Sequence, residues 1–335
     1  MVTMQDVARH AGVSVMTVSN VVNDHPHVRK TTREKVVASI EELGYRVNTT
    51  ARSLRQGRTG VIGLALPEID RPYFGLLSAL LIERARQYDY DIVVEQTGAR
   101  RENEMDAILH SRLRSYDGLL LHASQLAQED AALLRGDFPI VVLGERAYSA
   151  PVDHVVMDNE QGATLAARHL IDRGCTRIAM IGGRPWSPGD VDVATMRTKG
   201  FVAEIEAAGL ELGPGQVQPT RYNLADSRDA VGRLLKEVGA VDGIFCATDW
   251  VAFGVLRGLA DAGLRVPEDV RIVGFDDVPQ AAFSTPSLSS IAPDHEAMAD
   301  AALKLLVGRI AGERPRDDFR EVFGAVRLIP RESSA

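Results

Sequence analysis

Polar and aromatic side chains recur directly after the apolar segments of residues 60–290, where they suit the binding of a small polyol. Aromatic rings can cover the C–H face of a sugar, and Asp, Arg and Thr side chains can hydrogen-bond its hydroxyl groups. The candidate ligand contacts of this kind are Tyr73, Phe74, His122, Arg146, Trp186, Thr248, Asp249 and Asp276. Each residue alone could equally be a helix cap or part of a loop ion pair, but their recurrence favours a binding pocket.

A second candidate site lies in residues 13–23, which contain no acidic side chain. Val15, Met16, Thr17 and Asn20 fall on the outward face of a short helix expected there. Asn can pair bidentately with adenine, and Val or Met can contact a thymine methyl group, so this face suits DNA base edges. Further polar side chains nearby could hold phosphates, which fix register rather than sequence; they are Ser14, Thr17, Asn23, His27 and Thr32.

The charge of the chain is distributed unevenly. Residues 1–58 contain nine Lys or Arg and five acidic residues, a net charge of +4, whereas the remaining 29 basic and 41 acidic residues give −12. A basic head on an acidic body is expected when only the head meets a polyanion. The charge pattern therefore supports DNA as the partner of residues 1–58.

The composition is that of an ordinary globular protein with more than one domain. The chain has 335 residues, of which 45% are hydrophobic and 25% charged. Its longest apolar runs are far shorter than the roughly 18 residues needed to span a bilayer. The N-terminus lacks a signal-like pattern, so we expect a cytoplasmic, nucleoid-associated protein without a membrane partner. Cys175 and Cys246 have no metal-ligand spacing and are expected to be reduced core thiols.

No motif points to catalysis. Gly60-Val-Ile-Gly63 is too short for a dinucleotide-binding fingerprint, and the chain lacks Gly-x-Ser-x-Gly, His-Glu-x-x-His and Walker sequences. We therefore expect no enzyme activity, no catalytic residue, no metal and no cofactor. A small-molecule binding protein without a regulatory role remains an alternative for the body, although it would not need residues 1–58.

Three short helices are predicted in the head. Thr3 and Asp6 form a capping-box pattern before a helix that ends at Gly12, and Ser14 is a good N-cap for a second helix through about Val22. Thr31-x-x-Glu34 predicts the cap of a third helix that ends at Gly44. The first two helices and their short connection form a helix-turn-helix. A plain three-helix bundle would explain the apolar pattern equally well.

The body alternates predicted strands with amphipathic helices such as Phe74–Tyr88, Glu160–Arg173 and Asp249–Ala262. Apolar strands separated by helices indicate parallel sheets covered on both faces. About 275 residues are too many for one such sheet, so two lobes are expected. The predicted strands are Val61–Leu66, Asp91–Glu95, Gly118–His122, Ile140–Leu143, Val155–Met157, Arg177–Ile181, Gly243–Ala247 and Arg271–Phe275.

The head contains three motifs with a specific pattern: the segment from Met4 to Asn23, Thr32-Arg-Glu-Lys-Val36 and Leu43-Gly-Tyr45. With these motifs the head resembles the lactose-repressor (LacI/GalR) family of bacterial transcription regulators. It implies that Val15, Met16 and Asn20 occupy base-reading positions. The next segment, Asn48 to Gly57, resembles the family's hinge helix. There the resemblance implies DNA contacts for Asn48, Ala51 and Arg52, with Leu54 as a wedge between central base pairs.

The resemblance extends more loosely over the body. Arg197-Thr-Lys-Gly-Phe201 is similar to an element whose Arg binds effector, and Val273-Gly-Phe-Asp-Asp277 to one whose Asp accepts effector hydroxyls. Tyr222 falls near a stacking aromatic of the family. Thr248 stands where an amide is commoner, so the specificity of another member cannot be borrowed. These matches imply effector contacts for Arg197, Tyr222 and Asp276.

The expected fold class is an N-terminal all-α helix-turn-helix headpiece plus an α/β, periplasmic-binding-protein-like core of two doubly wound parallel-sheet lobes with three crossovers. The expected domains are 1–47 for the headpiece, 48–58 for the hinge and 59–335 for the effector-binding and dimerisation core. Lobe 1 is expected at about 60–159 and 291–320, and lobe 2 at about 160–290 and 321–332.

The resemblance implies a repressor that binds a palindromic operator in double-stranded DNA as a homodimer or tetramer. A small effector, a sugar or sugar derivative, would bind between the lobes and control DNA affinity. A regulator that acts mainly as an activator remains an alternative, and effector binding could either release DNA or promote DNA binding. No leucine-heptad tail follows Pro330 to support a tetramerising coil.

Overall fold

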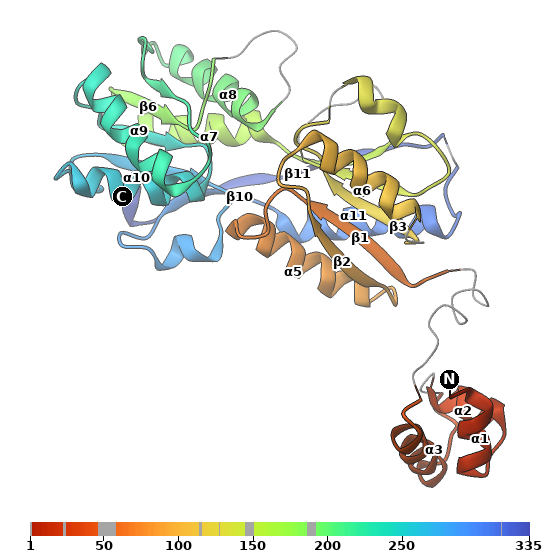
Figure 1. The fold of residues 1–335 in the computed structure, drawn as a ribbon. Coiled ribbons are helices and arrows are strands. Elements are labelled where there is room, and N and C mark those ends of the chain that lie inside the picture. The colour runs from red at the N-terminus through yellow and green to blue at the C-terminus, as the bar shows by residue number, and fades with distance from the viewer. Residues whose placement is uncertain are drawn as a thin grey trace. The chain divides into compact units, whose positions relative to one another are not determined.

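The computed structural model describes residues 2–22, 25–45, 58–113, 116–126, 128–144, 151–185, 192–315 and 317–335. The chain forms two compact units, Met1–Thr59 and Gly60–Ala335 (Figure 1). The predicted hinge lies outside the described residues, apart from Arg58.

The first unit is a three-helix head of α1 (Met4–Ala11), α2 (Val15–Val22) and α3 (Lys30–Leu43). Thr3 and Asp6 form the predicted capping box, and Gly12 ends α1 in the left-handed region with φ 65°. Ser14 Oγ accepts the Thr17 N–H at 3.1 Å, as expected of an N-cap. The buried core of the head contains Val7, Ala8, Val18, Val21, Val36 and Tyr45.

The third helix begins earlier than predicted. Arg29 is its N-cap, and no side chain caps this end. The Arg29 carbonyl accepts the N–H groups of Thr32 and Arg33, both at 3.0 Å. Thr31 therefore lies inside the first turn, and its predicted capping role is wrong because the backbone ladder starts two residues before it.

The second unit contains two six-stranded sheets, one in each lobe. The order in the first lobe is β11-β5-β4-β3-β1-β2 and in the second β12-β10-β9-β8-β6-β7. All neighbours are parallel except the antiparallel pair β10–β12. The eight predicted strands are present. The strands are β1 (Val61–Leu66), β2 (Asp91–Gln96), β3 (Gly118–His122), β4 (Ile140–Leu143), β5 (Asp153–Met157), β6 (Ile178–Ile181), β7 (Val217–Gln218), β8 (Gly243–Cys246), β9 (Arg271–Phe275), β10 (Ser289–Pro293), β11 (Glu321–Gly324) and β12 (Val326–Ile329).

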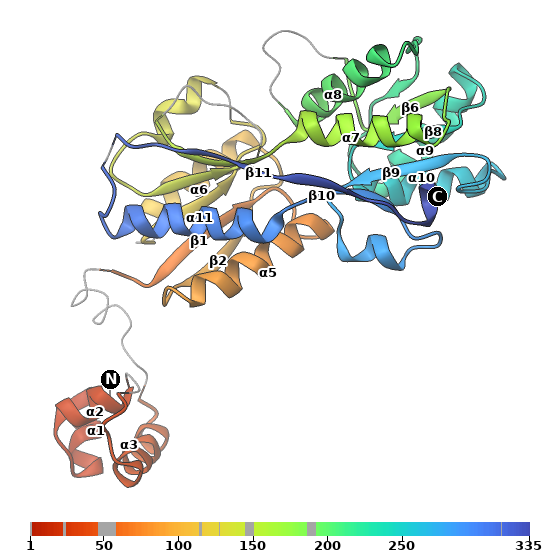
Figure 2. The ribbon, with the colours of Figure 1, turned by 180° about the vertical axis from the view of Figure 1, so that it is seen from behind.

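Helices cover both faces of each sheet (Figure 2). In the first lobe, Leu64 and Leu66 pack in one cluster with α5 (Pro72–Arg86) and α11 (His295–Ile310), whereas Ala65 packs in another with α6 (Arg101–Leu113). The second lobe repeats this arrangement with α7 (Asn159–Asp172) and α8 (Val193–Ala207) on one face and α9 (Leu224–Glu237) and α10 (Asp249–Asp261) on the other. Three short 3-10 helices complete the fold: η1 (Gln128–Leu134), η2 (Pro279–Phe283) and η3 (Glu332–Ser334).

Three chain segments connect the lobes, at positions that differ in part from the expectation. The first connection, between β5 and α7, is where it was expected. Strand β10 pairs with β9 and so belongs to the second lobe, and β11 pairs with β5 and so belongs to the first. The other connections therefore fall near Asp294 and Ala325 rather than at 290–291 and 320–321. The expected boundaries at those two places are wrong by a few residues. The chain adds β10 to the sheet of the second lobe, and later β11 to the sheet of the first lobe, before it crosses to the other lobe.

Both cysteine side chains are buried, Cys175 near the start of β6 and Cys246 at the end of β8. Burial raises the pKa of both thiols, which agrees with the expected core role. None of the helices in the described residues has the length and apolar character needed to cross a membrane.

Candidate functional site

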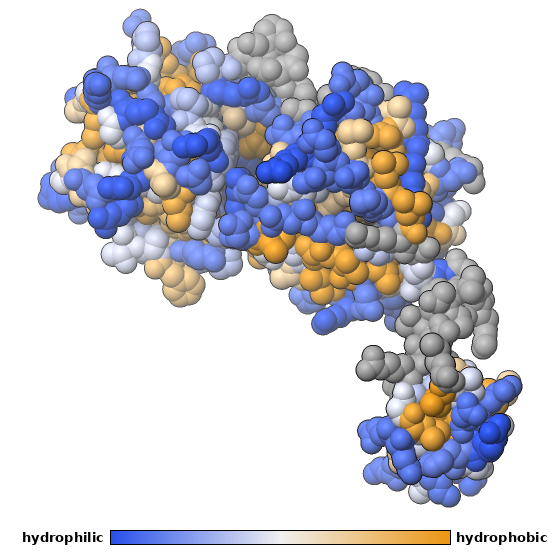
Figure 3. Space-filling model, in the orientation of Figure 1, coloured by the Kyte–Doolittle hydropathy of each residue, from blue (hydrophilic) through white to orange (hydrophobic). Residues whose placement is uncertain are grey.

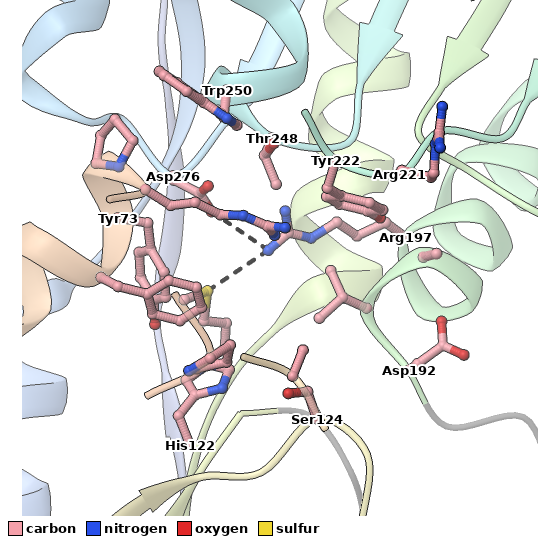
Figure 4. Close-up of a pocket in the computed structure, with 18 of the residues that line it drawn as sticks. Tyr73, His122, Ser124, Asp192, Arg197, Arg221, Tyr222, Thr248, Trp250 and Asp276 are labelled. Carbon is pink, nitrogen blue, oxygen red and sulfur yellow. Dashed lines mark hydrogen bonds and ion pairs between the residues drawn. The ribbon is translucent and has the colours of Figure 1, made fainter. Parts of the chain in front are cut away.

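A cavity of about 480 Å³ lies between the two lobes (Figure 4). It sits where parallel strands of both sheets end, which is the usual place for ligands in open α/β sheets. Strand β3 leads to His122, β8 to Thr248 and β9 to Asp276. The predicted contacts that line this pocket are Tyr73, Phe74, His122, Arg197, Tyr222, Thr248 and Asp276. Arg146 and Trp186 lie outside the described residues.

Arg197 on α8 is the buried cation of the pocket wall, with 2% of its side chain exposed. Its Nε donates to Asn159 Oδ1 at 2.7 Å, and its Nη1 donates to the Ala247 carbonyl. The guanidinium lies 3.4 Å from the centre of the Phe275 ring, a cation–π contact. Its Nη2 is 3.6 Å from Asp276 Oδ1. Arg197 therefore connects three elements of the second lobe as well as orienting Asp276.

Asp276 follows β9 on a strained backbone. Asp276 has φ 107° and Asp277 has φ 47°, both in the left-handed half of the Ramachandran map where non-glycine residues are uncommon. The Asp276 N–H donates to the Ile291 carbonyl at 2.9 Å, and His295 Nε2 lies 2.6 Å from the Asp276 carbonyl oxygen. Strain of this kind persists where the surroundings fix it, and it clusters at ligand sites. The bend presents the Asp276 carboxylate at the cavity (Figure 4).

Four rings from the first lobe form an aromatic cluster at one side of the pocket. The rings of Phe74 and His122 meet edge to face with centroids 4.9 Å apart, and those of Tyr73 and Phe74 are 5.1 Å apart. His295 lies 5.7 Å from Tyr73. Trp250, at the start of α10, lines the cavity from the second lobe. Ring faces from both lobes can thus cover the apolar side of a ligand.

Tyr222 stands just before α9 with φ 55°. Its hydroxyl donates to the Gly182 carbonyl at 2.8 Å. Burial raises the pKa of Tyr222 to about 12, against the opposing effect of the Arg197 guanidinium. The phenol therefore stays neutral at physiological pH and fixes the loop after β6 against the loop before α9.

Asp249 does not line the pocket, so the predicted effector contact does not hold for this residue. Its side chain is completely buried and accepts the Ser290 hydroxyl at 2.6 Å and the Val278 N–H at 2.8 Å. Burial raises the pKa of its carboxyl well above the usual range. Asp249 thus connects the first turn of α10 to β10 and to the segment after β9. Its position after a strand did not distinguish this structural role from ligand binding.

Several lining residues were not among the predicted contacts. Some of them stand close after predicted strands, whereas others precede helices whose N-termini face the cavity. The additional charged, polar and aromatic side chains are Arg71, Ser124, Gln125, Arg184, Asp192, Arg221 and Trp250.

A buried carboxylate holds the loop that contributes Ser124 and Gln125 to the pocket. Glu104 on α6 has no exposed surface. It accepts the N–H groups of Ser124, Gln125 and Leu126 at 3.0, 3.0 and 2.9 Å, and the Ser124 hydroxyl at 2.9 Å. These bonds fix the backbone after β3.

Glu104→Gln should lower the unfolding free energy by about 1.5–3 kcal/mol, because the amide replaces one accepting oxygen with an NH₂ group that faces backbone N–H donors. Calorimetric melting of the variant measures this loss. Glu102→Gln, at an exposed position of the same helix, is the matched control. Equal melting temperatures for the two variants would show that Glu104 does not hold the loop.

The side chains predicted to read bases lie on α2. Val15 and Met16 are large apolar side chains that are 42% and 74% exposed. The hydroxyl oxygens of Ser14 and Thr17 lie 2.9 Å apart on the first turn. Asn20 and Thr32 are half-buried and His27 is exposed. The other predicted DNA contacts lie outside the described residues; they are Asn23, Asn48, Ala51, Arg52 and Leu54.

Family models match both units of the chain. Residues 3–48 match the model described as "Bacterial regulatory proteins, lacI family", and residues 167–334 match the "Periplasmic binding protein-like domain". The chain is 33% identical to a ribose operon repressor of Halalkalibacterium halodurans over 100% of this chain and 97% of that protein. It is 32% identical to the transcriptional repressor PurR of Haemophilus influenzae over 98% of this chain and 96% of that one.

Solved structures agree with these relationships. The Lac repressor dimer bound to operator and the anti-inducer ONPF superposes with a TM-score of 0.81 at 26% identity, covering 99% of both chains. A complex of the regulator CelR with cellobiose superposes with a TM-score of 0.73 at 29% identity, covering 99% of this chain and 100% of that one. With a helix-turn-helix head, a two-lobed core and full-length relatives of this kind, the chain belongs to the LacI family of bacterial transcription regulators.

Proposed function

We propose that the protein is a transcriptional repressor that binds a palindromic operator as a homodimer and whose DNA affinity is controlled by a small polyol. The observation that carries this proposal is the presence, in one chain, of a helix-turn-helix head and a cavity of about 480 Å³ between two lobes. Operator and cellobiose complexes of similar proteins support the two halves of the proposal. The protein would act in the cytoplasm on nucleoid DNA.

The experiment is a selection of preferred sites from randomised duplex DNA, followed by operator binding in the presence of candidate ligands. Mono- and disaccharides and nucleobases form the panel. We expect a palindromic site and at least one ligand that changes operator affinity. Binding without sequence preference would contradict the proposal, as would a preferred site that persists for residues 60–335 alone.

An exposed apolar face of the first lobe supports the dimer. Strand β2 lies at the edge of its sheet, and Val93 and Val94 on it are 40% and 37% exposed. Leu76 and Leu80 of α5 are only half-buried, and apolar side chains gather over this helix (Figure 3). An edge strand beside an apolar helix face is a surface that proteins normally cover. We infer that a second copy of the chain covers it.

The switch would act through the segments that connect the lobes. His295 is the first residue of α11 in the first lobe and directly follows the connection near Asp294. Its ring contacts the carbonyl of Asp276 in the second lobe. A ligand held by Asp276 and by the rings near Tyr73 therefore favours one relative arrangement of the lobes over another. To move an equilibrium from 1:99 to 99:1 the ligand must prefer one arrangement by roughly 10⁴-fold.

Asn20→Ala should remove a base contact and weaken operator binding by about 1–3 kcal/mol, with relaxed preference at one symmetric position of each half-site. Selection from a randomised operator library measures the change. Glu41→Gln, at an exposed position of α3, is the control.

Leu54→Ala should instead abolish the sequence preference at the central base-pair step of the operator and leave the preference within the half-sites unchanged. If wild type and both variants selected identical sites, the roles assigned to Asn20 and Leu54 would be refuted.

A further inference from the structure

We propose that the ligand of the interlobe pocket is an anionic sugar, one that carries a phosphate or a carboxylate group. The inference rests on the proposed function and narrows its ligand class. It follows from the charges that line the cavity, from how the lining carboxylates are already bonded, and from the helix ends that point at the cavity.

Arginine dominates the charged lining. Among the described lining residues, Arg71 comes from the first lobe and Arg184, Arg197 and Arg221 from the second, with two carboxylates, Asp192 and Asp276. Burial raises the pKa of the Tyr222 phenol, Arg197 lowers it, Asp276 raises it, and Arg71 and Arg184 lower it. Cations from both lobes thus converge on one region of the cavity.

The two lining carboxylates already have cationic or N–H partners. Asp192 Oδ1 accepts the Thr195 N–H at 3.0 Å as the N-cap of α8, and its Oδ2 pairs with Arg184 Nη2. Asp276 Oδ1 lies 3.6 Å from Arg197 Nη2. The Arg184 and Arg197 guanidiniums thus offset the charges of Asp192 and Asp276. The excess positive charge of the described lining comes from Arg71 and Arg221.

The arginines retain donors after these contacts. A guanidinium has five N–H donors, and Arg71 contacts Glu68 through Nε alone. Arg221 Nε is 3.7 Å from Asp226, and 83% of its side chain is exposed. Arg71 and Arg221 can therefore offer their terminal nitrogens as a bidentate fork, the geometry that suits phosphate and carboxylate.

Four helices begin at the cavity. The lining includes Arg71 before α5, Asp192 before α8 and Thr248 before α10, which are the N-caps of these helices. Tyr222 immediately precedes Asn223, the N-cap of α9. A helix N-terminus carries roughly half a positive charge and favours anions. These backbone charges add to those of the arginines, and they are partly offset by Asp192 at α8, by Asp226 in the first turn of α9 and by Asp249 in the first turn of α10.

Aromatic rings of the first lobe lie across the cavity from Arg221, which stands beside Tyr222 (Figure 4). Tyr73 and His122 lie on one side of the cavity, and Arg221 and Asp192 lie on the other (Figure 4). A sugar ring would lie against the aromatic side, and its anionic group would reach the end near Arg184 and Arg221. A neutral sugar would bring no negative charge to this end of the cavity, where Arg184 pairs with Asp192 and Arg221 lies near Asp226.

The test uses the full chain and titration calorimetry with matched ligands. The probes are glucose, glucose 6-phosphate, glucuronate, ribose, ribose 5-phosphate and inorganic phosphate, each at low and high salt. Arg221→Gln removes the cation with the most exposed side chain of the four. Arg257→Gln is the matched control, because Arg257 is 70% exposed on α10, pairs with Asp261 at 2.6 Å and does not line the cavity.

At least one charged sugar should bind about tenfold or more tightly than its neutral parent, and Arg221→Gln should weaken its binding by about tenfold or more. High salt should also weaken the binding of the charged sugar. Arg257→Gln should leave its affinity unchanged. The phosphate and carboxylate arms show which anion the pocket takes.

Several results would overturn the inference. These are neutral parents that bind as tightly as the charged forms, an unchanged affinity in Arg221→Gln, inorganic phosphate that binds as tightly as the sugar phosphates, and no binding of any probe. The proposed function fails separately, in the operator selection, which needs no ligand. Tight binding of a neutral sugar that also changes operator affinity would contradict the proposed anionic ligand, while the proposed repressor function would stand.

Discussion

Between 50 and 200 mM salt, the affinity of the protein for its operator is expected to fall by about 10³–10⁵, as it does when roughly six to ten phosphates are neutralised by a dimer. The reason is the net charge of +4 in residues 1–58 against −12 in the rest of the chain. Arg29, Lys30 and Lys35 are exposed, whereas Arg9, also exposed, lies 3.4 Å from the Asp6 carboxylate that caps α1. The cations of the head are therefore available to DNA phosphates.

Fluorescence anisotropy on a labelled operator across a salt series measures this slope. Arg29→Gln should reduce the slope by about one unit if Arg29 contacts a phosphate, and Arg257→Gln in the core should leave it unchanged. Residues 60–335 alone should bind DNA weakly at every salt concentration. A flat salt dependence would contradict electrostatic binding by the head, and so would a core that binds with the full-length slope.

Local signals predicted the head in detail, because a helix cap is decided by residues only a few positions apart. Thr3, Asp6, Gly12 and Ser14 act as expected. The failure at Thr31 has the same origin, since a matching Thr-x-x-Glu spacing cannot show that the backbone of Arg29 has already started the helix. The strands of the core were equally accessible, because buried parallel strands are continuous apolar runs.

Long-range partners explain what the sequence did not reveal. Asp249 and Asp276 both follow strands, yet Asp249 is buried against Ser290 and Val278 while Asp276 lines the cavity. Glu104 gave no signal because the N–H groups that it accepts lie about 20 residues away, beyond β3. The connections near Asp294 and Ala325 depend on which sheet edge β10 and β11 join, which no local pattern encodes.

Arg197 and Asp276 should behave differently when substituted, although both were predicted as effector contacts. Arg197 is almost completely buried, holds Asn159 and the Ala247 carbonyl, and lies over Phe275. Arg197→Ala would remove one partner of a buried, hydrogen-bonded cluster, so the unfolding free energy should fall by about 3–5 kcal/mol. Calorimetric melting measures this loss, and operator binding without ligand would weaken as the folded fraction falls.

Asp276→Asn keeps the shape of the side chain and should act mainly on the ligand, with a smaller loss of stability because Asp276 lies 3.6 Å from the buried Arg197. Loss of a charged acceptor for ligand hydroxyls should cost about 2–5 kcal/mol of ligand affinity, or roughly 30- to 5,000-fold. Because the coupling between ligand and operator is reciprocal, the ligand-free operator affinity should stay within a few fold of wild type. Operator binding titrated with the effector measures both quantities, and Asp229→Asn, on the exposed side of α9, is the control. If Asp276→Asn lowered the melting temperature yet responded at an unchanged effector concentration, Asp276 would be scaffold and the effector would bind elsewhere.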